Sequence, residues 1–136
     1  MLLVDDDTRV LVSSDTDIVL ARQKGRALAV GLGFSASDAT LVATAISELA
    51  RNIVLYAGQG EIILKRLDNG GRTGVSVVAR DDGPGIKDID HAMQDGYSTS
   101  GRLGLGLPGV RRLMDEFEIV SDAGKGTCVT VRKWSR

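Results

Sequence analysis

At 136 residues, 43% of them hydrophobic, the chain is expected to form a single domain, residues 1–136, with a buried core. Its formal net charge of −1 argues against nucleic acid or a membrane surface as a partner, and no apolar run approaches the roughly 20 residues of a membrane-spanning helix. The single cysteine, Cys128, cannot form an intrachain disulfide, so a reducing, cytoplasmic location is expected.

The first part of the chain predicts one strand and two helices. Residues 9–13 read as a strand. Ser14 or Asp15 can cap a first helix that runs to about Leu32, and a second helix is expected over about residues 36–57, capped within Ser35–Asp38. The apolar stripe expected on this second helix comprises Leu41, Ala45, Leu49, Ile53 and Tyr56.

Two hairpins are expected in the rest of the chain. Strands over 61–67 and 74–79 flank a turn rich in Asn and Gly. Strands over 118–122 and 127–133 flank a second glycine turn. The apolar alternation around Cys128 predicts a buried strand position for this residue rather than a reactive thiol.

Between the hairpins lies a long glycine-rich stretch, residues 81–105, followed by a helix expected over 106–115. Apart from one helical turn expected near 89–95, the stretch lacks regular structure, and such a segment inside a compact domain is usually a lid or a binding loop. The fold class expected from this order is an α/β two-layer sandwich, with helices on one face of a mixed, mostly antiparallel sheet.

Two polar residues share one face of the second expected helix. Glu48 and Asn52 are four positions apart, which is about one helical turn. The carboxamide oxygen of Asn52 suits Mg²⁺, which takes few protein ligands besides substrate phosphates. Glu48 could then orient or deprotonate an attacking hydroxyl or water. The alternative is a solvated polar face, or a hydrogen bond between the two side chains.

An acidic glycine loop follows the strand that ends near Ala79. Asp81 at this strand end can accept a hydrogen bond from an adenine amino group, while Gly83 and Gly85 would let a base approach the backbone. Asp82 is expected to face solvent. The alternative is a plain turn, since Asp-Gly and Gly-Pro-Gly are strong turn signals.

A second glycine loop directly precedes the helix expected over 106–115. Backbone amides at a helix N-terminus bind phosphate, and glycines let its oxygens come close. The spacing fits a dinucleotide-binding fingerprint only in part, and a P-loop is excluded by the missing Gly-Lys-Ser/Thr. A surface loop is the alternative. The residues proposed to contact phosphate here are Ser98, Thr99, Gly101, Gly104 and Gly106.

The last glycine element is Gly124-Lys125-Gly126-Thr127, a tight turn by its composition. Combined with the acidic loop, Thr127 could hydrogen-bond the Asp81 carboxylate and hold its orientation. The single histidine, His91, is expected at the surface, and no Cys/His cluster favours zinc.

In this order, the four elements resemble the GHKL superfamily of ATP-binding domains found in gyrase, Hsp90, histidine kinases and MutL. Residues 48–52 match its N box, and 81–85, 101–106 and 124–127 match its three glycine boxes. Beyond the boxes, the segments 45–53, 95–101 and 106–115 look like the RsbT-like branch, the serine/threonine switch kinases of the bacterial stressosome.

The resemblance implies a Bergerat-type fold that binds ATP and Mg²⁺ and phosphorylates STAS-domain proteins, a scaffold and an antagonist. It also implies that the kinase then leaves that complex and activates a PP2C-type phosphatase by partner switching. Glu48 would be the catalytic base, Asn52 the magnesium ligand and Asp81 the adenine contact. The remaining implied contacts are Gly83 and Gly85 at the base, Gly104 and Gly106 at the phosphates, and Thr127 behind Asp81.

Two other functions fit the same residues. One is an anti-sigma-factor kinase, which would bind a sigma factor and phosphorylate an anti-anti-sigma STAS protein. The other is a nucleotide-gated binding module without catalysis. Co-purification with a sigma factor would favour the first, and a lack of ATP consumption would favour the second. Arg51, inside the N box, receives no role from the resemblance.

Overall fold

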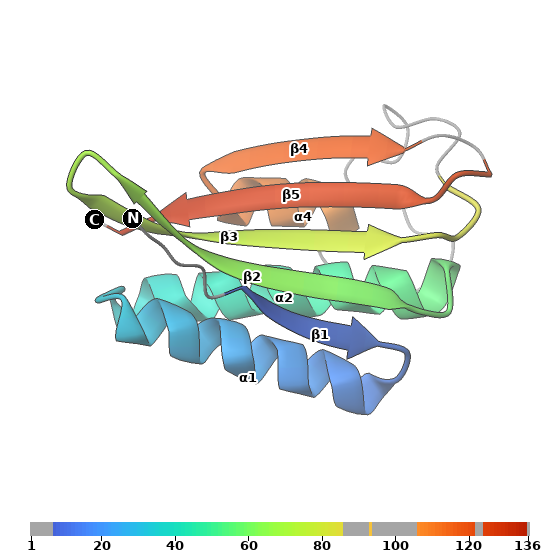
Figure 1. Ribbon diagram of the computed structural model, residues 1–136, viewed down its shortest axis with the longest axis horizontal. Helices are drawn as coiled ribbons and strands as arrows, with labels where there is room; N and C mark the ends of the chain where they lie inside the picture. The colour runs from blue at the N-terminus through green and yellow to red at the C-terminus, as the bar shows by residue number, and fades with distance from the viewer. Residues whose placement is uncertain (1–6, 86–92, 94–105, 122–123, 136) are drawn as a thin grey trace.

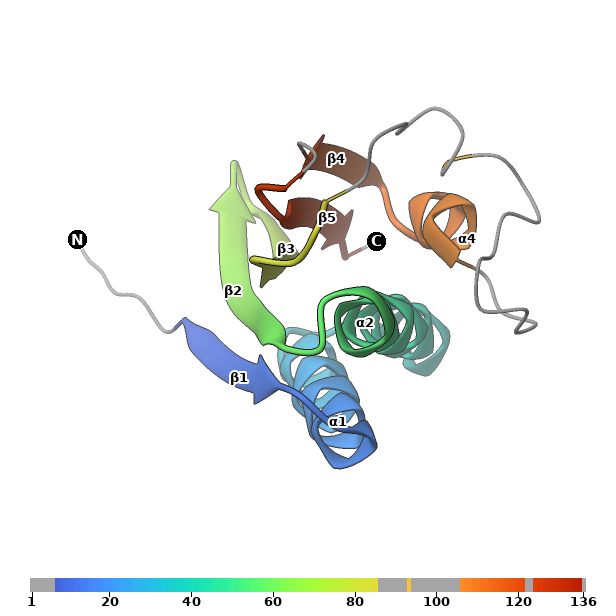
Figure 2. The same cartoon turned by 90° about the vertical axis from the view of Figure 1, so that its right-hand side faces the viewer.

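The computed structural model describes residues 7–85, 93, 106–121 and 124–135. Its five strands form one sheet in the order β1-β2-β3-β5-β4, and each neighbouring pair is antiparallel. Figures 1 and 2 show the described helices gathered on one face of that sheet. The expected α/β sandwich is therefore confirmed. The elements are β1 (Thr8–Val12), α1 (Asp15–Gly31), α2 (Ala36–Tyr56), β2 (Gly60–Asn69), β3 (Arg72–Asp81), α4 (Gly106–Leu113), β4 (Glu116–Ser121) and β5 (Thr127–Trp134).

The first two helices start where expected, but only the second has the expected side-chain cap. Ser35 is the N-cap of α2, and its hydroxyl accepts a hydrogen bond from the Asp38 amide at 3.1 Å. Ser14 is the N-cap of α1, but its side chain does not cap the helix. The Asp17 carboxylate instead accepts hydrogen bonds from the Ser13 amide at 2.9 Å and from the Ser14 hydroxyl at 3.2 Å. The bond from the Ser13 amide lowers the pKa of Asp17.

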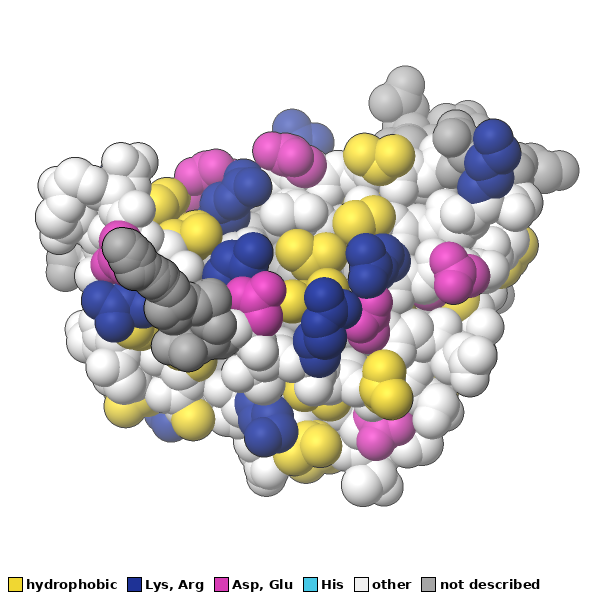
Figure 3. Space-filling view, in the orientation of Figure 1, with side chains coloured by type: hydrophobic (Ala, Val, Ile, Leu, Met, Phe, Trp, Pro, Cys, Tyr) yellow, Lys and Arg dark blue, Asp and Glu magenta, His cyan; other side chains and the backbone are white. Residues whose placement is uncertain are grey.

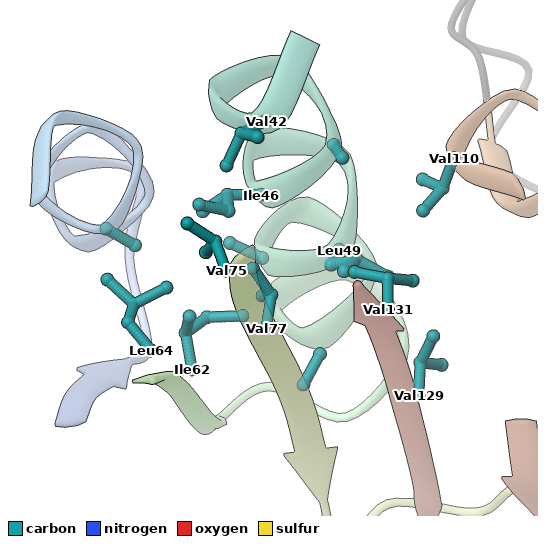
Figure 4. Close-up of a cluster of buried hydrophobic side chains, with 14 of the residues drawn as sticks. Val42, Ile46, Leu49, Ile62, Leu64, Val75, Val77, Val110, Val129 and Val131 are labelled. Carbon is teal, nitrogen blue, oxygen red and sulfur yellow. The ribbon is translucent and has the colours of Figure 1, made fainter. Parts of the chain in front are cut away.

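The core lies between the sheet and α2, which is covered on its flanks by α1 and α4 (Figure 4). Ile46 and Leu49 of α2 are 0% and 2% exposed. Gly25 lets α1 approach α2 closely, because a Cβ at this position would lie 2.0 Å from Cδ1 of Ile46. Val110 of α4 is fully buried on the other flank. The helix that carries the N-box residues is thus packed against the sheet, α1 and α4 (Figure 4).

A buried lysine fixes the direction of α4. Lys133 is only 4% exposed, and its ammonium group donates a hydrogen bond to the carbonyl of Leu113 at 3.0 Å. The Asp115 amide also donates to the carbonyl of Arg132 at 2.9 Å. The C-terminus of α4 therefore lies beside the end of β5. The N-terminus of this helix, which is about 12 Å long, lies farther along the sheet, away from that end (Figure 1).

Replacing Lys133 with alanine should destabilise the fold by about 2–3 kcal/mol. The change removes a charge-assisted hydrogen bond and leaves a helix C-terminal carbonyl without its donor. Denaturant unfolding measures the effect. The matched control is Lys65→Ala, whose 53% exposed side chain lies 3.7 Å from Asp7 and should contribute less than about 1 kcal/mol. Equal losses in the two variants would contradict this role for Lys133.

The other face of the sheet is not covered by any described helix and mixes charged and apolar side chains (Figure 3). Glu61 of β2 pairs with Arg9 of β1 and with Arg80 of β3. The hydrogen bond from Arg80 is the main cause that lowers the pKa of Glu61. Cys128, expected to be buried, is only partly buried, because it lies opposite Arg80 on this uncovered face. Within the described ranges, no helix is long and apolar enough to cross a membrane.

Candidate functional site

The N-box residues lie in the C-terminal half of α2, as expected. Glu48 is partly buried, with 13% of its side chain exposed. Its Oε1 pairs with Nη1 of Arg51 at 2.8 Å. The alternative of a Glu48–Asn52 hydrogen bond is wrong, because the described part of the chain contains no such bond. Arg51 is the residue that sequence reasoning missed. The sequence could have predicted this ion pair from the spacing of three residues between Glu48 and Arg51, because side chains at i and i+3 meet on a helix.

Asn52 is partly buried, and its side chain has no hydrogen bond to another residue in the described part of the chain. Its carboxamide oxygen is therefore available to a ligand. The described residues hold no group of three or more His, Cys, Asp or Glu that could bind a metal without help. A single neutral oxygen next to a carboxylate fits Mg²⁺ bound mainly by phosphate and water, and fits a protein-only metal site poorly.

Asp81 is the last residue of β3 and is partly buried. Its side chain starts on the α2 face, since a Cβ on the paired Gly60 would lie 3.1 Å from Cβ of Asp81 and 2.9 Å from Cγ2 of Ile53. Oδ1 accepts a hydrogen bond from the Gly83 amide at 2.8 Å. Oδ2 makes no hydrogen bond within the described ranges, which leaves it as an acceptor for an amino group.

The glycines of the acidic loop pack against α2. A Cβ on Gly83 would lie 2.6 Å from Cβ of Ala57, directly after the end of α2. The absence of a side chain at Gly83 thus allows the loop to pack closely against α2. The expected reason for this glycine was different, namely the approach of a nucleotide base to the backbone. Gly85 has φ of 76°, a conformation that favours glycine. Asp82 is exposed, as expected.

The second glycine loop falls largely outside the described residues. This applies to Ser98, Thr99, Gly101 and Gly104, and to His91. Gly106 is described, and it begins α4 as expected. Because the C-terminus of α4 lies at the end of β5, Gly106 lies toward the end of the sheet at which β3 finishes with Asp81.

The β4–β5 turn lies against the acidic loop. The Gly124 amide donates to the carbonyl of Pro84 at 2.6 Å, and Thr127 pairs with Asp81 across the sheet. The expected hydrogen bond from Thr127 to the Asp81 carboxylate is absent. The Thr127 hydroxyl instead lies 2.8 Å from that of Ser121, because β4 places Ser121 directly opposite it. Thr127 therefore joins β4 to β5 at this position.

Gly126 is the residue of this turn for which the structure allows no side chain. Its φ is 85°, and a Cβ would lie 2.1 Å from the backbone oxygen of Asp81. Gly126→Ala should destabilise the fold by about 2 kcal/mol or more and weaken nucleotide binding, because the obstacle is backbone rather than a flexible side chain. Unfolding curves and titration with ATP measure the two effects.

Gly124→Ala is the matched control for Gly126→Ala. Gly124 has φ of 81°, but a Cβ there would meet no atom within 4 Å. Its replacement should cost only the conformational energy of a positive φ, about 1 kcal/mol. If both variants bound ATP equally, the close approach of Gly126 to Asp81 would not matter for the site.

These elements meet at one end of the sandwich. Ile53 of α2 lies beside Gly60 and Asp81, the loop at Gly83 lies on Ala57, and the turn at Gly124 reaches the acidic loop. Figure 2, which faces this end, shows α2 between α1 and α4 on one face of the sheet. A hollow of about 170 Å³ borders Asp81 and the β4–β5 turn, but Arg80 and Cys128 of the uncovered face also line it and no residue of α2 does. It is smaller than the roughly 300–1,000 Å³ of most small-molecule sites. The arrangement brings an amino-group acceptor and an available amide oxygen to one end of α2.

Comparison with known proteins agrees with this arrangement. The family described as histidine kinase-, DNA gyrase B- and HSP90-like ATPase matches residues 37–135. Serine/threonine-protein kinase RsbT of Bacillus subtilis is 52% identical over 133 residues, which cover 98% of this chain and 100% of RsbT. An anti-sigma F factor of Thermoanaerobacter is 32% identical over 120 residues, covering 84% of this chain and 82% of that protein.

Among solved structures, the crystal structure of the RsbU and RsbW domains of a Mycobacterium tuberculosis protein matches with a TM-score of 0.63 at 23% identity. The match covers 97% of this chain and 33% of that longer chain, and it supports the fold alone. The GHKL resemblance seen in the four sequence elements is confirmed. The chain belongs to the histidine kinase-, DNA gyrase B- and HSP90-like ATPase family, in the branch that includes serine/threonine-protein kinase RsbT.

Proposed function

We propose that this chain is an ATP-dependent protein serine/threonine kinase that acts by partner switching. Its substrates are STAS-domain proteins, a scaffold and an antagonist, and its later partner is a PP2C-type phosphatase that it activates by binding. The observation that carries the proposal is the 52% identity to RsbT across the whole of that protein. A single free cysteine suits action in the reducing cytoplasm.

The residues on α2 and β3 have distinct tasks in the proposed transfer. Asp81 holds the adenine amino group through Oδ2. Asn52 would hold Mg²⁺, which would supply neutralisation of the negative charge of the phosphates. Glu48 accepts the proton of the attacking Ser or Thr hydroxyl. The hydroxyl oxygen forms a bond to the γ-phosphorus, the bond from that phosphorus to the bridging oxygen breaks, and ADP leaves.

Positioning accounts for most of the catalysis in such a transfer. Glu48 and Asn52 lie on a helix that is buried on its other sides, so their backbone has little freedom. Asp81 is fixed to the same helix through Gly60 and Gly83. A site assembled on rigid elements in this way supports a kinase that must orient one hydroxyl of a separate protein.

The first test asks where the phosphate goes. The protein is incubated with Mg-ATP and a purified STAS-domain protein, which is then digested for peptide mass spectrometry. A phosphate on a Ser or Thr of the STAS protein is the expected result. ATP binding without modification of any of several STAS proteins would contradict the kinase assignment.

A second candidate function, an anti-sigma-factor kinase, is favoured by the 32% identity to anti-sigma F factor. Phosphatase assays and co-purification separate the two functions. The proposed function predicts that adding this protein raises the activity of a PP2C-type phosphatase. Recovery of a sigma factor in a stable complex, with no effect on the phosphatase, would favour the anti-sigma function instead.

A further inference from the structure

The N box contains an ion pair that the proposed chemistry has not yet used. Nη1 of Arg51 lies 2.8 Å from Oε1 of Glu48, and 35% of the Arg51 side chain is exposed, against 13% for Glu48. Oε2 of Glu48 makes no hydrogen bond with a residue of the described part of the chain. One carboxylate oxygen is therefore held and the other is available.

The pair contributes little to the stability of the helix. Pairs at i and i+3 on a helix stabilise it only weakly. The neighbouring positions Leu49, Ala50 and Ile53 are almost fully buried, so packing holds this part of α2 in place without the pair. The effect of Arg51 should therefore be local, on the position and charge of one carboxylate.

The position and the charge environment of the Glu48 carboxylate both matter if it acts as a base beside a triphosphate. A free glutamate can rotate about its side-chain bonds, and its negative charge is repelled by the γ-phosphate. A carboxylate fixed at one oxygen by a guanidinium presents the other oxygen in one direction, and the nearby positive charge offsets the repulsion. These are the requirements for taking a proton from a hydroxyl aimed at phosphorus.

Building on the proposed kinase function, we propose that Arg51 is a positioning residue for Glu48. It binds Oε1, so that Oε2 faces the substrate hydroxyl and removes its proton as the new oxygen–phosphorus bond forms. Arg51 itself contacts neither ATP nor the substrate. Loss of Arg51 should therefore slow transfer and leave nucleotide binding intact.

The test compares Arg51→Met, Arg51→Lys and the control Arg22→Met, an exposed arginine of α1 with no ion pair in the described part of the chain. Phosphate transfer to a STAS-domain protein gives kcat and KM, and calorimetry gives the ATP Kd. We expect Arg51→Met to lower kcat about 10-fold with the ATP Kd changed less than about 2-fold. Arg51→Lys should keep a higher kcat than Arg51→Met, because lysine retains the positive charge. It should not reach the wild-type kcat, because lysine lacks the planar guanidinium group that fixes the direction of the carboxylate.

A double variant separates positioning from a general structural effect. In the Glu48→Ala background, Arg51→Met should cause no further loss of transfer, because there is no carboxylate left to position. A further loss of transfer in the double variant would overturn the inference. So would a wild-type transfer rate in Arg51→Met, or a shift in its thermal unfolding that accounts for a lower rate. If the wild-type protein transfers no phosphate, the proposed kinase function is wrong, and the proposed role of Arg51 is then wrong as well.

Discussion

Glu48→Ala should lower the rate of phosphate transfer by about 10²–10⁴-fold, the usual contribution of a positioned general base. ATP affinity should change less than about 2-fold, because the carboxylate acts on the hydroxyl and not on the nucleotide. Glu48 lies on a helix fixed by the buried residues Ile46 and Leu49, so the variant should fold. Single-turnover transfer to a STAS-domain protein, with calorimetric titration of ATP, measures both quantities.

The control for Glu48→Ala is Glu118→Ala on β4, whose side chain is 68% exposed and lies away from α2. This variant removes a carboxylate of the same type and should transfer phosphate at the wild-type rate. A Glu48→Ala protein that transfers phosphate at a rate close to that of Glu118→Ala would show that another group takes the proton.

Asp81→Asn should weaken ATP binding by about 10- to 150-fold, which corresponds to the 1.5–3 kcal/mol of a hydrogen bond to a charged group. Oδ1 of Asp81 accepts the Gly83 amide at 2.8 Å, and an asparagine oxygen can keep this bond. The amide nitrogen would then take the place of Oδ2 and present a donor to the adenine amino group, which is also a donor. Calorimetry with ATP measures the loss.

Asp82→Asn is the matched control for Asp81→Asn, since it removes the same charge at the next, exposed position. It should bind ATP with nearly wild-type affinity. Because the Asp81→Asn protein keeps its loop contact, its thermal unfolding should stay close to that of wild type. Equal ATP affinity in the two variants would exclude Asp81 as the adenine contact.

The expected secondary structure agreed with the structure wherever local signals decide it. Ser35 and the acidic residue three positions later predicted the start of α2, and the structure contains that cap. The first hairpin is longer than expected. Asn69 pairs with Arg72, so the turn contains only Gly70 and Gly71, both at positive φ. Turn composition located the hairpin, but the point where pairing stops depends on cross-strand contacts.

Burial on α2 was predicted only in part, because one apolar stripe assumes one packed face. Ala45, Leu49 and Ile53 are buried as expected. Val42 and Ile46 are also fully buried, since α1 and α4 cover the flanks of the helix. Tyr56, expected in the stripe, is 44% exposed at the last residue of α2. The number of elements that pack around a helix depends on the tertiary structure, and the spacing of apolar residues in its sequence does not predict it.

In the candidate site, too, the sequence predicted the features that depend on local spacing and did not predict those that depend on the tertiary structure. The helical spacing of Glu48 and Asn52 and the strand-end position of Asp81 followed from the sequence. The partners of the side chains did not, since the Glu48 carboxylate binds Arg51 and the Thr127 hydroxyl binds Ser121. The second pairing required the β4–β5 register, which connects residues six positions apart across a turn.

The most direct test of the kinase assignment is the intact mass of a STAS-domain protein after incubation with Mg-ATP and this protein, with Glu48→Ala run in parallel. A gain of one phosphate with the wild-type protein, and none with Glu48→Ala over the same time, is the result that the proposed function predicts. An unchanged mass in both reactions, with ATP binding intact, would contradict it.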